Sequence, residues 1–217
     1  SRDGIAMLKK TGEETWNQPC QMGNPMAKVC KDSAVVADQG GTNIYVFQKD
    51  GLKGEIQATR PIERVAVSAQ GVVAAILQDE ENPKVMCYDA KGNVLVEHKA
   101  SLASTGYPVA IDLSQDGKVL IVSYLYALGN GVASKVAFYH FGETGADKED
   151  YQVAQKEYKD TIIPTAAFLD KNTSLFITDQ SFIIYEGLEE PKEKLAVKID
   201  KEIQSVAYDE KRIALVL

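Results

Sequence analysis

The sequence has few of the residues that usually carry metal or redox chemistry. Its 217 residues include three cysteines, two histidines and one tryptophan. Neither His98 nor His140 lies near a cysteine at the spacing of a metal site, and no CxxC pair is present. We therefore expect no metal site and interpret the cysteines as small buried apolar residues. Cys20 and Cys30 could form one disulfide, and the sequence leaves that pairing open.

Basic clusters and long apolar runs are also missing. No basic cluster is longer than Lys9-Lys10, and the formal net charge is −7 with a pI near 5.0. Nucleic acids and anionic membranes are bound by grouped Lys and Arg, so neither is an expected partner. No apolar run reaches the ~18 residues of a membrane-spanning helix. The first four residues also lack the apolar segment of a signal peptide.

What the sequence does contain is a repeat of about 40 residues. Turn signals recur at Thr11-Gly12, Asp50-Gly51 and Lys91-Gly92, each between two apolar segments. A second set of markers is proline at the start of an alternating segment, where no ladder hydrogen bond is lost. These prolines are Pro25, Pro61, Pro108 and Pro164.

Each repeat contains four predicted strands, which we call A to D, and helix is nearly absent. Strand B is the most apolar, as in residues 71–77 and 118–124, and strand C ends in an aromatic residue such as Phe47 or Tyr88. Strand D is the most polar. Buried inner strands and a solvated outer strand are what a β-propeller blade needs. Residues 147–160 also match helical spacing, but the repeat favours an outer strand preceded by a charged loop.

We therefore predict an all-β fold: a β-propeller of four-stranded antiparallel blades, with about four complete blades and a half-blade at each end. Residues 4–8 and 14–17 supply strands C and D, and residues 203–217 supply strands A and B. Two arrangements stay open. The halves form one blade of a five-bladed ring, or residues 1–217 are a single propeller domain cut from a longer propeller. The apolar end at Leu217 favours the second.

Segments across nearly the whole chain carry a family likeness. They are residues 12–16, 24–25, 37–41, 61–68, 106–108, 123–126 and 137–139. Together they resemble a family of uncharacterised extracytoplasmic β-propeller proteins of Gram-positive bacteria, a domain of unknown function. The resemblance implies a location on the cell-surface side of the membrane. It also implies a membrane anchor outside this chain, further propeller sequence after Leu217, and no known activity.

Two segments resemble propellers more broadly. Residues 114–120 are similar to the S-P-D-G-K-x-L hairpin of WD40-like propellers, with Gln115 in place of the proline. Residues 12–16 resemble the glycine-to-tryptophan docking segment of quinoprotein (PQQ-like) propellers. That segment recurs in most quinoprotein blades but occurs once here, so we expect no quinone and no other cofactor.

Motifs for catalysis are weak. Residues 112–117 begin like a calcium loop, but position 12 is Ser123 and no helices flank them, which favours a hairpin turn. Gly129-Asn130-Gly131 lacks the helix and third glycine of a dinucleotide site and is interpreted as a flexible loop. Acidic pairs such as Glu149-Asp150 fall in polar segments. We therefore expect no catalytic residues and a protein that is not an enzyme.

Blade geometry predicts the binding surface. The D–A and B–C connections emerge at one edge of the blades, and the A–B and C–D turns emerge at the other. The first set is longer and includes eleven residues from 124 to 134, whereas the second is mostly tight glycine turns. Because function concentrates on variable loops, we predict that a partner binds the first edge. The predicted contacts are Asp38, Arg60, Asp79, Tyr107, Tyr126 and Asp179.

Alternatives stay open for both the residues and the function. The aromatic residues would otherwise pack between blades, and the aspartates would cap turns. We favour a non-enzymatic binding or scaffold module for a protein or cell-envelope component. The other candidates are a quinone-linked or sugar-active enzyme, which needs converging acids or a metal, and the sensor domain of a larger membrane-anchored protein.

Overall fold

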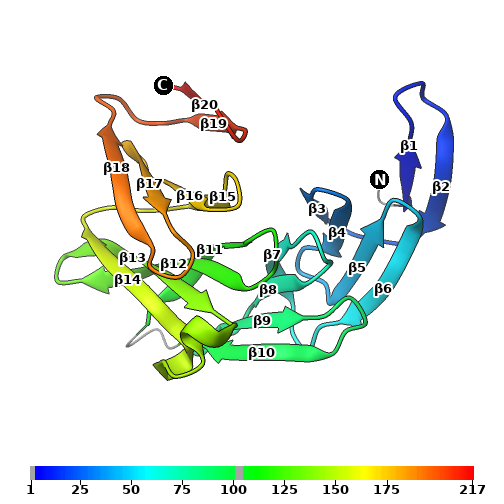
Figure 1. Cartoon of the computed structure of the whole chain (residues 1–217), viewed down its shortest axis with the longest axis horizontal. Coiled ribbons are helices and arrows are strands. Elements are labelled where there is room, and N and C mark those ends of the chain that lie inside the picture. The colour runs from blue at the N-terminus through cyan, green and yellow to red at the C-terminus, as the bar shows by residue number, and fades with distance from the viewer. Residues whose placement is uncertain (1–2, 101–104) are drawn as a thin grey trace. The chain divides into compact units, whose positions relative to one another are not determined.

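The computed structural model describes residues 3–100 and 105–217, and it is built almost entirely of antiparallel strands (Figure 1). The chain divides into two compact units, Ser1–Lys99 and Ala100–Leu217. No helix among the described residues is long and apolar enough to cross a membrane. The prediction of an all-β chain with four complete four-stranded sheets is confirmed.

The first unit holds a two-stranded sheet and two four-stranded sheets. The two-stranded sheet is a hairpin of β1 (Gly4–Leu8) and β2 (Glu14–Pro19). The other two sheets, blades 1 and 2, each have neighbouring strands in sequence order, so they match the predicted A-B-C-D pattern. Blade 1 contains β3 (Pro25–Cys30), β4 (Ser33–Asp38), β5 (Asn43–Gln48) and β6 (Gly51–Gln57), and blade 2 contains β7 (Ile62–Val67), β8 (Val73–Leu77), β9 (Lys84–Tyr88) and β10 (Val94–Lys99).

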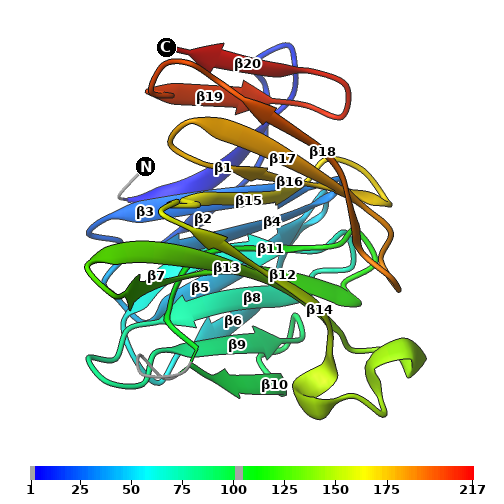
Figure 2. The same ribbon diagram turned by 90° about the vertical axis from the view of Figure 1, so that its left-hand side faces the viewer.

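The second unit has the same content in the opposite order. Its sheets are two four-stranded blades, 3 and 4, followed by a two-stranded sheet, and Figure 2 shows them as successive layers. Blade 3 contains β11 (Tyr107–Leu113), β12 (Val119–Leu128), β13 (Gly131–His140) and β14 (Gln152–Lys159). Blade 4 contains β15 (Thr165–Phe168), β16 (Thr173–Ile177), β17 (Ser181–Glu186) and β18 (Lys192–Lys198), and the last sheet pairs β19 (Ser205–Tyr208) with β20 (Ile213–Val216).

Each unit buries the inner strands of its blades between neighbouring sheets. In the first unit β8 is buried along its whole length, and Val35 and Val46 of blade 1 pack in one core with Val73 and Leu77 of blade 2. Phe138 of blade 3 lies in edge contact with Phe176 of blade 4, at a ring-centroid distance of 5.8 Å. A strand covered on both faces must be apolar at every position, which explains the continuous apolar runs.

The turn markers of the repeat lie where the sequence predicts them. Gly12, Gly51 and Gly92 have φ of +84°, +116° and +87°, a region that favours glycine, and each lies at the turn between strands C and D. Pro25 opens β3, and Pro61 immediately precedes β7. Both prolines therefore sit where no internal ladder donor is lost.

The segment with mixed helix and strand signals forms both kinds of structure. Residues 152–159 are the predicted outer strand β14. The segment before this strand holds two single-turn 3₁₀ helices, η1 (Glu143–Gly145) and η2 (Glu149–Tyr151). A charged loop was expected before this strand, and it is an ordered insertion that makes blade 3 an exception to the mostly tight glycine turns of the C–D edge. The insertion is held by edge contact between Phe141 and Tyr151, whose ring centroids lie 5.9 Å apart.

A polar latch joins the outer strands of blades 3 and 4. The Tyr158 hydroxyl donates to the Glu193 carboxylate at 2.6 Å and lies 2.7 Å from the Tyr185 hydroxyl. Lys156 pairs with the same carboxylate at 2.7 Å. Burial raises the pKa of Tyr185 to about 12, although the bond to Tyr158 acts in the opposite direction. The latch therefore keeps both phenols neutral and hydrogen-bonded at physiological pH.

The packing of blade 1 on blade 2 can be tested by a substitution at Gly54. A Cβ atom added to this β6 residue would lie 1.7 Å from the Ala90 carbonyl oxygen in the β9–β10 turn, so backbone would have to move. We expect Gly54→Ala to lower the free energy of unfolding by about 3 kcal/mol. Urea denaturation measures this change.

Gly23→Ala is the matched control. Its added Cβ would lie 3.7 Å from the nearest atom, an Asp38 carboxylate oxygen, which is ordinary contact. We expect its stability to change by less than about 0.5 kcal/mol. Equal stability of the two variants would contradict the close packing of blade 1 on blade 2.

Candidate functional site

Three connections of the first unit meet at the edge predicted to bind a partner. The B–C connection of blade 1 is tied to the start of β7 by two backbone bonds, Gly40 N–H to Ile62 C=O and Ile62 N–H to Gly41 C=O, both 2.8 Å long. Gln78, at the start of the B–C connection of blade 2, donates its backbone N–H to the Pro61 C=O at 2.8 Å. The loops that carry Asp38, Arg60 and Asp79 are therefore fixed against one another.

Arg60 and Asp79 form an ion pair at this edge. The guanidinium Nη1 lies 3.0 Å from the Asp79 Oδ2. The other carboxylate oxygen accepts the backbone N–H groups of Glu81 and Asn82, each at 3.1 Å. The bonds from Asn82 and Glu81, followed by the charge of Arg60, hold the pKa of Asp79 below its usual range. Asp79 is thus an ionised anchor for Arg60, whose side chain is half-exposed.

Asp38 has a turn-closing role. Its Oδ1 accepts the Asn24 backbone N–H at 2.7 Å, and a Cβ at Gly41 would lie 2.8 Å from its Oδ2. For Asp38 the sequence leaves both turn capping and partner contact open. The structure shows the capping bond from the Asn24 backbone N–H. Partner contact at Asp38 stays a prediction.

In the second unit, Tyr107 and Tyr126 lie on neighbouring strands with their side chains on opposite faces of the sheet, and Asp179 lies elsewhere. Tyr107 begins β11 and pairs with Leu125, the neighbour of Tyr126. The Tyr126 hydroxyl donates to the Glu157 carboxylate of β14, and burial, with the bond to Glu157, raises the Tyr126 pKa to about 12. Asp179 is exposed in the β16–β17 turn, where its backbone C=O accepts the Ile203 N–H at 2.8 Å.

The long loop expected at residues 124–134 is instead a regular hairpin. The β12–β13 pairing is unbroken from Val119↔His140 to Leu128↔Gly131, and Gly129-Asn130 makes the turn. Gly129 has φ of +61°, as a two-residue hairpin turn needs. Gly129 and Asn130 therefore form the tight turn between two long strands. The expectation of a flexible loop at residues 129–131 is wrong.

We call residues 125–134 the arm, because they extend blade 3 at its B–C edge. Its strands β12 and β13 have ten residues each, against five or six in the corresponding strands of the other blades. Leu128 and Val132 on the arm are 41% and 39% exposed, and Ile162 is 40% exposed. Asp160 donates its backbone N–H to the Val132 C=O at 2.9 Å, which fixes the arm to the end of β14. The sequence prediction missed this exposed apolar set.

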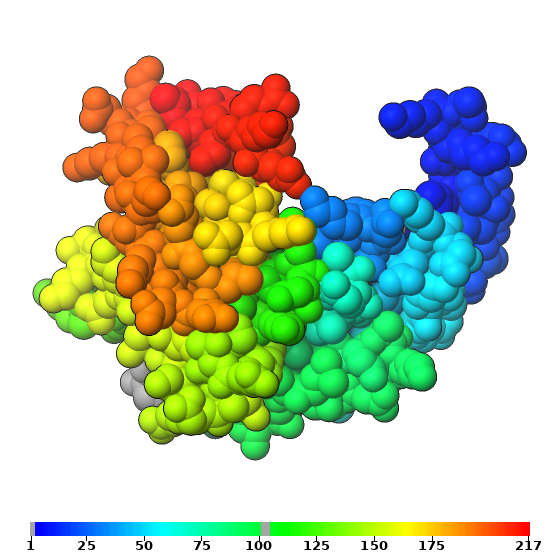
Figure 3. Space-filling model, viewed as in Figure 1, coloured from blue at the N-terminus to red at the C-terminus, as the bar shows by residue number. Residues whose placement is uncertain are grey.

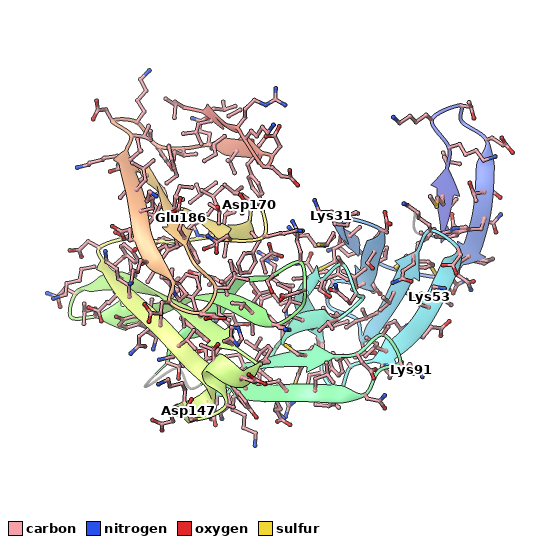
Figure 4. All side chains as sticks on the ribbon, in the orientation of Figure 1. Lys31, Lys53, Lys91, Asp147, Asp170 and Glu186 are labelled. Atoms are coloured by element: carbon pink, nitrogen blue, oxygen red, sulfur yellow. The ribbon has the colours of Figure 1, made fainter. Side chains whose placement is uncertain are left out.

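A second missed feature is an apolar crevice in the first unit. It has a volume of about 280 Å³ and lies between the β1–β2 hairpin and blade 1, with Ile5, Met7 and Val29 among its lining residues. Trp16 stacks on Phe47 at 5.1 Å and 7°, and its Nε1 donates to the Lys49 C=O at 3.1 Å. Figure 3 shows the hairpin as a dark blue projection rising from blade 1, and Figure 4 labels Lys31, which lines the crevice at the β3–β4 turn.

The histidine, cysteine and acidic residues considered for metal or catalytic roles show no such site among the described residues. Within residues 3–100 and 105–217, no group of three His, Cys, Asp or Glu residues is placed to hold a metal ion. Cys20, Cys30 and Cys87 form no disulfide, and burial raises the pKa of Cys87 to about 12. The His140 Nδ1 accepts the Gly142 backbone N–H at 3.1 Å. The Asp116 carboxylate bonds within its own hairpin turn, accepting from Ser114 and Lys118.

Comparison with known proteins gives one family match and several structural matches. A model of the "Family of unknown function (DUF5711)" matches residues 1–217. KlAtg21, in its complex with the coiled-coil of AgAtg16, matches with a TM-score of 0.67 at 13% identity, covering 99% of this chain and 70% of that chain. A functionally unknown protein from Desulfotomaculum acetoxidans DSM 771 gives 0.63 at 10% identity, covering 99% and 69%. No curated protein matches by sequence.

A third structural match supports the same conclusion about the fold. Kluyveromyces lactis Hsv2 matches with a TM-score of 0.59 at 13% identity, covering 91% of this chain and 68% of that chain. At such low identity these likenesses show the fold alone, and that fold is the predicted β-propeller. The chain spans about two thirds of the length of these solved structures, and 66% of the length of an Hsv2 with an altered loop.

The Arg60–Asp79 pair predicts an acid-dependent loss of stability. Because the folded pKa of Asp79 is lowered, its contribution is fully present above the unfolded pKa of about 3.9 and is lost as pH falls through the folded value. We expect the urea midpoints of wild type and Asp79→Asn to differ at pH 6 and to converge towards pH 2. Arg60→Gln should keep most of this pH dependence, because backbone donors are the larger cause. A difference between wild type and Asp79→Asn that is constant with pH would contradict the assignment.

Proposed function

The chain belongs to DUF5711, a family of unknown function, and from this premise we propose that it is a non-enzymatic binding module for a protein or cell-envelope component. The proposal places the module outside the cytoplasmic membrane, on the basis of the sequence likeness to extracytoplasmic propellers. The partner contacts the edge where the B–C and D–A connections emerge, which is where variable segments stand on a rigid scaffold.

The observation that carries the proposal is the arm of blade 3. Leu128 and Val132 are held in a ladder of paired strands, so they cannot turn inward, yet both stay exposed to solvent. Rigid exposed aliphatic side chains with a polar surround are the usual centre of a protein-binding surface. In the first unit, Arg60 and Asp79 would add a fixed charge pair at the edge where the B–C and D–A connections emerge.

The polar groups of the predicted surface favour binding over chemistry. Asp79 is engaged by Arg60 and two backbone donors, and the Tyr126 hydroxyl is engaged by Glu157. Groups fixed in this way can present hydrogen bonds and charge to a partner without proton transfer. The solved structure of KlAtg21 with a coiled-coil shows that one protein of this fold binds a protein partner.

Photo-crosslinking tests the arm directly. A photoreactive residue replaces Asn130 at the arm tip or, as the control, Asp147, which Figure 4 labels in the C–D insertion of the same blade. Each protein is irradiated with a detergent-solubilised cell-envelope extract of a Gram-positive bacterium. We expect discrete crosslinked products at position 130 and none of them at position 147. Identical crosslinked products at positions 130 and 147 would contradict the proposal.

Introducing negative charge at Leu128 and Val132, which lie on opposite faces of the arm, gives a quantitative version of this test. We expect Leu128→Glu with Val132→Glu to reduce these position-130 products by at least about tenfold, because carboxylates at the centre of an interface must be desolvated. The control is Leu195→Glu on β18, where the leucine is 48% exposed. It should leave the products unchanged. Full retention of the products by the double variant, with the same thermal midpoint as wild type, would contradict binding by the arm.

A further inference from the structure

The tip of the arm carries the only Asn-Gly pair in the sequence, Asn130-Gly131. Asparagine is one of the chemically labile residues of proteins. The backbone nitrogen of the next residue can attack its side-chain amide carbon and close a five-membered imide ring, an intramolecular reaction that needs no catalyst. A side chain on the next residue hinders this attack, and glycine has none. The residues that make the hairpin turn are therefore also a reactive pair.

The other six asparagines all precede a residue with a side chain, and each has a further obstacle to this reaction. Two precede proline, whose nitrogen has no proton to lose. Two donate their side-chain amides to carboxylates, at 2.6 and 2.7 Å, which holds the amides in place. Two precede β-branched residues, which crowd the attacking nitrogen. In the same order, these pairs are Asn24 and Asn82, Asn17 and Asn93, and Asn43 and Asn172.

The structure leaves the Asn130 amide open to water. Residues 129–131 are all exposed, and no hydrogen bond in the described part of the chain holds the Asn130 side chain. Gly129 supplies the positive φ of the turn, at +61°, so that Asn130 is the second of the two turn residues. Both the amide carbon and the water that the reaction consumes are therefore available at the tip.

Asp160 explains why glycine stands at position 131. A Cβ atom added to Gly131 would lie 2.9 Å from the Asp160 Oδ1, so a side chain that shielded the Asn130 amide would have to displace this carboxylate. Asp160 also donates its backbone N–H to the Val132 C=O at 2.9 Å. The packing that fixes the arm to the end of β14 thus favours the glycine that makes Asn130 labile.

We propose that Asn130 is a site of spontaneous modification, at which the side-chain amide is hydrolysed through a cyclic imide. The Gly131 nitrogen gives its proton to water and attacks the Asn130 Cγ. The Cγ–Nδ2 bond then breaks, and the nitrogen leaves as ammonia after taking up a proton. Water next adds to either imide carbonyl, which gives aspartate or isoaspartate. One water is consumed and one ammonia released for each residue converted, and no oxidant or enzyme takes part.

Both products alter the arm. Aspartate at position 130 adds a carboxylate one residue from the contact between Gly131 and Asp160, and the two negative charges repel. Isoaspartate adds one carbon to the main chain of a turn that has only two residues. We expect this extra atom to open the Leu128↔Gly131 pair and to release Leu128 from its fixed position. The modification is independent of the proposed function, whereas its effect on partner binding rests on it.

The hairpin itself slows the reaction. The two residues that flank a two-residue turn are hydrogen-bonded to each other. The Gly131 nitrogen is therefore engaged while the tip is closed, and the attack proceeds from the rare open state of the tip. The unfolded chain should convert faster than the folded one, and this difference measures how well the arm protects its own tip.

Peptide mapping by mass spectrometry tests the chemistry. Residues 1–217 are incubated at physiological temperature in H₂¹⁸O, at neutral and at mildly alkaline pH, and digested at mildly acidic pH, where the imide forms slowly. We expect the Asn130 peptide to gain an ¹⁸O-labelled carboxylate in two chromatographic forms. It should convert at least about tenfold faster than the Asn43 and Asn172 peptides of the same digest. The rate should rise with pH, because the attacking nitrogen must lose its proton.

Asn130→Gln is the matched variant, because its longer side chain must close a larger ring while Gly131 and Asp160 stay unchanged. Wild type unfolded in urea shows the rate without the hairpin. Conversion at Asn130 no faster than at Asn172, over a time in which the unfolded chain converts fully, overturns the proposal. After equal incubation, amide hydrogen exchange in the arm should be faster in wild type than in Asn130→Gln. Equal exchange in a fully converted sample would overturn the predicted opening of the tip.

Discussion

The structure depends on covering both faces of strands that carry no polar side. The inner strands are apolar at nearly every position, and β8 and most of β4 and β12 are buried. A sheet with such strands cannot expose either face to water without losing roughly 25 cal/mol for each Å² of apolar surface. Successive sheets must therefore stack. The arm, the fixed loops and the crevice all follow from where this stacking continues and where it stops.

The architecture could be predicted from the sequence because the same pattern of turns, apolar strands and a polar strand recurs in each blade. Each blade contains the same order of turn, apolar strand and polar strand, so the glycine turns at Gly51 and Gly92 and the proline at Pro25 gave independent markers of strand position. The arm was missed because Gly129-Asn130 signals a turn without giving the length of the strands it joins. The insertion of η1 and η2 was missed because charged residues fit a coil and a 3₁₀ turn equally well.

The candidate site was less predictable, because it depends on contacts between segments that are distant in sequence. The order of strands in the repeat placed Arg60 and Asp79 at the same edge, but their ion pair depends on how blade 1 packs on blade 2. Likewise, nothing local to Tyr126 indicates its bond to Glu157, which arises from the register of β12, β13 and β14. The crevice likewise depends on how the β1–β2 hairpin packs on blade 1, where Trp16 stacks on Phe47.

The unbroken β12–β13 pairing of the arm also affects how the arm would bind a partner. Paired strands up to Leu128↔Gly131, with the Asp160 bond beside them, leave the backbone of the arm one conformation before any encounter. Little chain entropy is then lost when a partner arrives, and the free and bound forms share one shape. A surface of this kind selects partners by fit. Changes of side chain at its tip would redirect selectivity while the sheets beneath stay as they are.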